Sequence, residues 1–129
     1  MIILFISTLF LTLLLVRIGA HKFHDMENYG TKDDRSRTIT GFLRIKTGKD
    51  WHHIHFGLIL LLIASPIILL YGLTTISVIL LAIGLSLVAD QITPLIDRKS
   101  NYFHKNKLIL SIIFHLIIAG IAILILPMS

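Results

Sequence analysis

The chain has 129 residues and a net charge of +5, but only 15% of its residues are charged while 55% are hydrophobic. A soluble domain of this size carries roughly a quarter charged residues, so the composition excludes a soluble domain and predicts a polytopic membrane protein. The absence of cysteine excludes disulfides, thiolate metal sites and Fe–S clusters. The basic charge is typical of membrane topology and of anionic lipid headgroups as partners, and we expect no nucleic-acid partner.

Four apolar runs approach the length of about 20 residues that a helix needs to cross a bilayer. They cover residues 2–20, 54–73, 74–96 and 108–126. The first run lacks the preceding basic residues of a signal peptide, so we expect it to be a retained span. The sequence therefore predicts an all-α polytopic integral membrane protein, a four-transmembrane-helix bundle that forms a single membrane domain over residues 1–129.

All twelve basic residues fall in or beside the two long loops, residues 21–53 and 97–107. The positive-inside rule then predicts a multi-pass protein of the cell (plasma) membrane, with both loops cytoplasmic and both termini outside. Within the first loop, Gly41–Lys46 mixes apolar and basic residues over two turns. This piece is either a short interfacial helix with its cations on lipid phosphates or an ordinary solvated loop.

Histidines gather near the predicted cytoplasmic ends of the spans. The six there are His21, His24, His52, His53, His55 and His104. If the first span continues as a helix, His21, His24 and Asp25 share one face. His52 and His55 also share a face because they are three residues apart, whereas His53 turns away. Imidazole is a common ligand for transition metals, and such pairs are a usual helical way to present two of them.

Asp90 lies inside the apolar run of the third span. A charge there costs a few kcal/mol, so such a residue is normally kept for a partner. Asp90 and His55 are nearly equally far from the turn near Leu73, which predicts that they share one level of the hairpin. Ala82, Ser86 and Asp90 repeat every four residues, so we expect a neighbouring helix to approach this face closely.

Two interpretations of these polar residues remain open. The first is a metal site whose predicted ligands are His52, His55, Asp90, His21, His24 and Asp25. A set of imidazoles with one carboxylate suits Zn, Fe, Cu or Mn, and the carboxylate of Asp90 could instead orient a ligating histidine. The second interpretation is that the residues bond to one another, to backbone and to headgroups. The deeper His115 is either an interhelical hydrogen-bonding residue with Ser111 or part of a proton relay.

The stretch Arg44–Gly57 contains His52-His53-Ile54-His55-Phe56-Gly57, and the next span ends in the run Gly84–Gln91. Both features resemble a group of small prokaryotic integral membrane proteins with an HHxHxG motif at a span start and an Asp after a glycine-containing run. The resemblance covers about Arg44–Gln91. The group has no established activity, so the resemblance names no reaction. Membrane fatty-acid hydroxylases and desaturases match poorly, because they need more histidines, in different boxes, and a longer chain.

The preferred functional prediction is a small membrane protein that binds a divalent transition metal at its cytoplasmic face, with the reaction left open. If it is an enzyme, a metal-activated water acting on a lipid or quinone-like substrate is the chemistry that such ligands allow. The alternative is a non-catalytic accessory or structural subunit that packs against other membrane subunits. A copper membrane monooxygenase of the ammonia- or methane-oxidising kind is an example of such a complex.

Overall fold

A computed structural model describes residues 1–23, 39–47, 52–96 and 105–126 of the chain. The described residues form helices and contain no strand, which confirms the predicted all-α fold. The helices are α1 (Ile2–Phe23), α3 (Ile39–Thr47), α4 (His53–Tyr71), α5 (Thr75–Ile96) and α6 (Lys105–Ile125). Four of them, all except α3, are long and apolar enough to cross a membrane, as the hydropathy pattern predicts.

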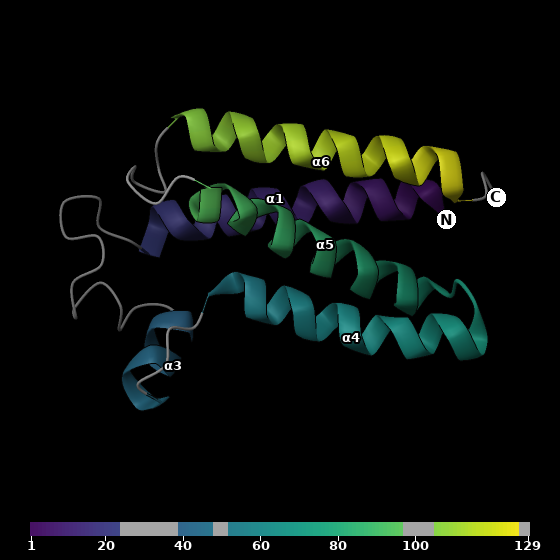
Figure 1. Ribbon diagram of the computed structural model, residues 1–129, viewed down its shortest axis with the longest axis horizontal. Helices are drawn as coiled ribbons and strands as arrows, with labels where there is room; N and C mark the ends of the chain where they lie inside the picture. Colours follow the sequence, from purple (N-terminus) through teal and green to yellow (C-terminus); the bar gives the residue numbers. More distant parts are fainter. Residues whose placement is uncertain (24–38, 48–51, 97–104, 127–129) are drawn as a thin grey trace.

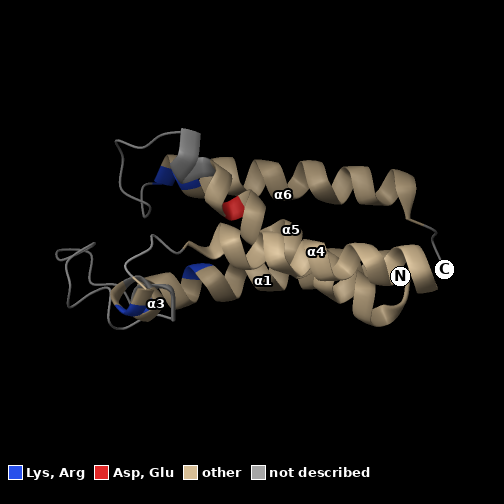
Figure 2. Ribbon diagram, turned by 60° about the horizontal axis from the view of Figure 1, so that its bottom comes forward, with Lys and Arg blue, Asp and Glu red and all other residues tan. Residues whose placement is uncertain are grey.

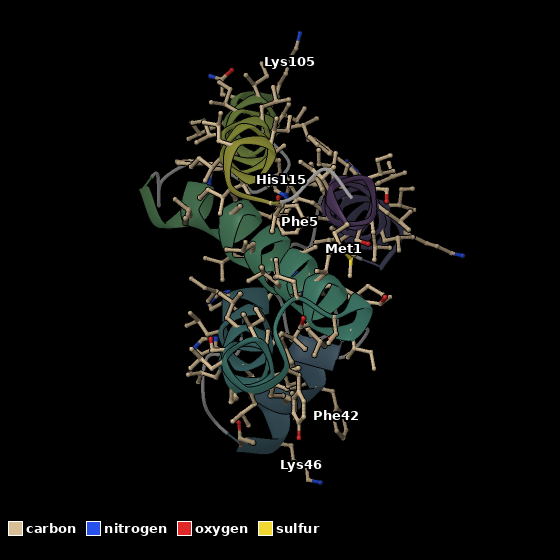
Figure 3. The ribbon with its side chains drawn as sticks, turned by 90° about the vertical axis from the view of Figure 1, so that its right-hand side faces the viewer. Met1, Phe5, Phe42, Lys46, Lys105 and His115 are labelled. Carbon is tan, nitrogen blue, oxygen red and sulfur yellow. The ribbon has the colours of Figure 1, made fainter. Side chains whose placement is uncertain are left out.

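Helix α5 is the centre of the bundle. It packs against each of the other three long helices, most extensively against α4, with α4 on one side and α1 and α6 on the other (Figure 3). The start of α1 and the end of α6 lie at the same end of the bundle, where α4 also turns into α5 (Figure 1); we call this the terminal end. The lysines and arginines of the described residues gather toward the opposite end (Figure 2), which we call the basic end.

The α4–α5 hairpin is held by a direct contact between two glycines. A Cβ atom at Gly57 would lie 2.8 Å from the carbonyl oxygen of Gly84, and a Cβ at Gly84 would lie 3.0 Å from that of Gly57. Real Cβ atoms essentially never come as close as the first distance and seldom as close as the second, so the helices approach this closely because both positions lack a side chain. The hairpin reverses at Gly72, whose φ of 72° favours glycine.

The terminal half of the interface between α1, α5 and α6 is apolar. Its buried cluster consists of Phe5, Leu9, Val78, Ala82, Ala119 and Ala122. The alanines on α5 and α6 leave room for the larger side chains of α1. The buried charged residues of the described chain therefore lie in the other half of the interface, nearer the basic end.

Candidate functional site: a buried ion pair beside a basic groove

A buried ion pair joins α1 to α5. Asp90 is 1% exposed and Arg17 is 8% exposed. Nη2 of Arg17 lies 2.6 Å from Oδ1 of Asp90, and Nε donates a hydrogen bond to the same oxygen at 2.9 Å. The hydroxyl of Ser111 on α6 donates a further hydrogen bond to this oxygen, also at 2.9 Å. One carboxylate oxygen therefore links three spans and is compensated by both a charge and a hydroxyl.

These three residues meet because they lie at one depth. Arg17 is the sixteenth residue of α1, which begins at Ile2, and Asp90 is the sixteenth residue of α5, which begins at Thr75. Both helices start at the terminal end, and equal residue counts mean equal axial rise. Ser111 is the fifteenth residue of α6 counted back from Ile125 at that same end. This equal depth can be counted from the sequence, but Arg17 follows the first apolar run and therefore groups with the loop cations in the positive-inside pattern.

A second polar contact lies one turn closer to the terminal end. His115 is fully buried, and its Nδ1 lies 2.7 Å from the backbone carbonyl of Ser111. Because a carbonyl only accepts, Nδ1 carries the proton, and in the neutral ring Nε2 accepts from the hydroxyl of Ser86 on α5 at 2.9 Å. His115 therefore does bond between helices, as one interpretation of the sequence expected. Its partner on the neighbouring helix is Ser86, while the Ser111 hydroxyl serves Asp90.

The two α4 histidines of the predicted metal site lie together at the start of that helix. The rings of His52 and His55 are stacked, with centroids 6.3 Å apart. Nδ1 of His55 accepts the backbone N–H of His52 at 3.1 Å, so this nitrogen satisfies a donor at the helix N-terminus. The ring of His55 is exposed, whereas Asp90, its predicted neighbour, is buried with Arg17.

The remaining predicted ligands are separated from this pair or fall outside the described residues. His21 is exposed near the end of α1, whereas His24 and Asp25 lie outside the described residues, as does His104 of the same histidine group. Within the described part of the chain, no group of three or more His, Asp or Glu side chains could hold a metal ion. The metal site therefore stays a prediction, and the guanidinium of Arg17 occupies the place beside Asp90 where a metal cation was expected.

A groove of about 860 Å³ runs between α1 and α6. It is lined by Phe10, Leu13, Leu14, Arg17, Ile18, His21, Lys22, Leu108 and Ile112. From Phe10 to Lys22 the α1 wall rises about 18 Å at 1.5 Å per residue. This is somewhat more than half of a hydrocarbon core of roughly 30 Å. The three nitrogen-bearing side chains, Arg17, His21 and Lys22, lie toward the basic end, and the rest of the lining is apolar.

The described residues around the groove carry more positive than negative charge. Arg17 and Lys22 line the groove, and the one carboxylate side chain among the described residues, that of Asp90, is paired with Arg17. Lys22 adds an exposed cation at the mouth of the groove.

Comparisons of the chain with protein-family models, with curated proteins and with solved structures find no match. The chemistry of the site is therefore the basis on which a function can be assigned.

Proposed function

We propose that the protein binds an amphiphile with an anionic headgroup in the groove between α1 and α6. The observation that carries this proposal is the groove itself, which is apolar along most of its length and has Arg17, His21 and Lys22 toward one end. Its volume of about 860 Å³ falls in the usual range for small-molecule sites, on the order of 300–1,000 Å³. An apolar wall with a cationic end is complementary to an acyl chain with a carboxylate or phosphate head.

The proposed ligand lies along α1, with its chain beside Phe10 and Leu14 and its head toward Lys22. Arg17 lies five residues deeper than Lys22, or about 7.5 Å along the helix axis. Asp90 contacts Arg17 from the interior of the bundle and holds the guanidinium in one orientation. Because Nε and Nη2 of Arg17 already face Asp90, the charge that attracts the head to the groove is that of the exposed Lys22.

We also propose that the basic end is cytoplasmic, which places the groove in the inner leaflet. All twelve basic residues of the sequence lie in or beside the two loops expected at that end, and this asymmetry sets orientation in membrane proteins. The chain has no native cysteine, so single cysteines introduced at Ser36 and Ser100 can be labelled cleanly in cells. We expect both to be labelled from the cytoplasmic side only, and labelling from outside would contradict the orientation.

Binding is tested with cis-parinaric acid, a fluorescent long-chain carboxylate, added to the purified protein in a non-ionic detergent. We expect saturable fluorescence that is displaced by a fatty acid or a lysophosphatidate but not by a monoacylglycerol of the same chain length. The stronger of the two anionic competitors distinguishes a carboxylate ligand from a phosphate ligand. Displacement by the neutral lipid with equal potency would contradict a cationic site.

Two tryptophan substitutions separate the groove from the general apolar surface of α1. Leu14 lines the groove, whereas its neighbour Leu15 does not, although both side chains are more than half exposed. We expect Leu14→Trp to fill the groove and weaken probe binding at least tenfold, and Leu15→Trp to leave it within about twofold of the parent. Equal effects of the two substitutions would place the ligand elsewhere.

The predicted metal site is retained as a second candidate, favoured by the stacked pair His52 and His55 at the basic end. It is tested by metal content per chain in the parent protein, His55→Ala, Asp90→Ala and His115→Ala at matched yield. A site built as predicted loses metal in the first two variants and keeps it in the third. If the parent and all three variants are free of metal, the metal site is contradicted. The non-catalytic subunit is then the alternative left from the sequence analysis.

A further inference from the structure

The short helix α3 presents apolar side chains away from the spans. Phe42 and Ile45 are three residues apart, which places them on one side of the helix, and they are 57% and 58% exposed. The sequence left this segment open between an interfacial helix and a solvated loop, and the structure makes it helical over Ile39–Thr47. An exposed apolar side on a basic helix is typical of a segment that lies on a membrane surface.

Lys46 lies on the same side of α3 as the aromatic ring. Its Nζ is 5.9 Å from the centroid of the Phe42 ring, which precedes it by one helical turn. Phe42 and Lys46 both point away from the four spans (Figure 3). The aliphatic stem of Lys46 thus follows apolar neighbours and ends in an ammonium. In this arrangement a lysine keeps its charge among lipid headgroups while its carbons stay in the apolar boundary.

The position of α3 supplies the partner for this surface. The helix lies at the basic end of the bundle, close to the start of α4 (Figure 1). The ends of membrane-spanning helices lie at the bilayer surface, so a helix beside the start of α4 lies close to lipid headgroups. The other described lysines and arginines gather toward the same end (Figure 2), which matches the negative surface of a membrane with anionic lipids.

We propose that α3 lies flat on an anionic phospholipid surface beside the spans, with Phe42 and Ile45 at the boundary between acyl chains and headgroups and the Lys46 ammonium on lipid phosphates. This contact uses the surface of the bulk bilayer, so it is independent of the groove between α1 and α6. Lipid bound in that groove would leave α3 unchanged, and the failure of either proposal would leave the other in place.

The test uses single cysteines on opposite sides of α3 in the cysteine-free chain. Ile45→Cys places a fluorescent label on the apolar side, and Thr47→Cys, a matched control, places it about 160° away around the helix. Each labelled protein is reconstituted in nanodiscs of phosphatidylcholine with and without phosphatidylglycerol, and contact is read from quenching by a lipid that carries a spin label near its headgroup. Gel filtration and far-UV circular dichroism check that every variant remains folded.

We expect quenching at position 45 to exceed quenching at position 47 at least about twofold in nanodiscs with phosphatidylglycerol. The difference should shrink without the anionic lipid, in high salt, and when Lys46→Glu is added. Equal quenching at both positions, or no response to anionic lipid, would overturn the proposal. Protection of position 45 from both lipid and aqueous quenchers would also overturn it, because the apolar side would then be covered by protein.

Discussion

Replacing Arg17 by methionine tests whether Asp90 depends on the guanidinium for its place in the interior of the bundle. Removing one partner of such a pair costs about 3–5 kcal/mol, because the remaining charge is left in a region of low dielectric constant. Asp90 is 1% exposed and would keep the hydrogen bond from Ser111. We therefore expect Arg17→Met to lower the free energy of unfolding by about 3 kcal/mol, at the low end of this range.

The reciprocal change should cost less. Asp90→Asn retains an acceptor for the Ser111 hydroxyl, and the side chain of Arg17, 10% exposed, lies on the groove. The long side chain of Arg17 can therefore turn toward the membrane–water interface, so we expect the free energy of unfolding to fall by about 1–2 kcal/mol. In the double variant neither charge is left alone, so the combined loss should fall short of the sum by about 2 kcal/mol.

These free energies can be measured by titrating the protein from non-ionic micelles with SDS and following helix content by circular dichroism. Ser7→Ala is the matched control, because Ser7 is exposed on α1 and its hydroxyl bonds to backbone carbonyls of its own helix. It should change stability by less than about 0.5 kcal/mol. If the losses from Arg17→Met and Asp90→Asn simply add in the double variant, the pair is not coupled and the reasoning fails.

Two further predictions concern packing and are read by the same titration. Gly57→Ala places a Cβ 2.8 Å from the Gly84 carbonyl oxygen and should lower the free energy of unfolding by about 1–3 kcal/mol. Gly19→Ala is the control, because a Cβ at Gly19 meets no heavy atom of the described residues within 4 Å. A larger loss of stability in Gly19→Ala than in Gly57→Ala would contradict this account. His115→Ala removes a fully buried ring and its bond to Ser86 and should cost about 2–4 kcal/mol. Ser86→Ala removes only the bond and should cost about 1 kcal/mol, so an equal loss in both variants would refute the role given to the ring.

Hydropathy predicted the four long helices because the bilayer sets their length and the need to satisfy backbone polar groups sets their conformation. The same reasoning identified Asp90 as a residue that requires a partner. Choosing that partner required knowing which side of α5 faces which helix. Counting from the hairpin turn considers only α4, the neighbour in sequence, and it therefore selected His55.

The structure shows that α5 uses different sides for its neighbours. Gly84 packs against Gly57 of α4, whereas Ser86 bonds to His115 of α6. Asp90 is four residues after Ser86 and so shares the side that faces α6 and α1. The groove was not predicted either, because its walls come from α1 and α6, and neither helix shows from its own sequence how far it stands from the other.

The occupancy of the groove is tested most directly by photo-crosslinking. A long-chain fatty acid with a diazirine in its acyl chain is irradiated with the protein in nanodiscs, and the modified residues are mapped by mass spectrometry. If the groove binds the anion, adducts concentrate on the α1 wall between Phe10 and Lys22 and on Leu108 and Ile112 of α6. They should disappear with excess unlabelled fatty acid but not with the corresponding alcohol. Adducts spread evenly over the exposed leucines and isoleucines of α4, and unaffected by competitor, would contradict the account.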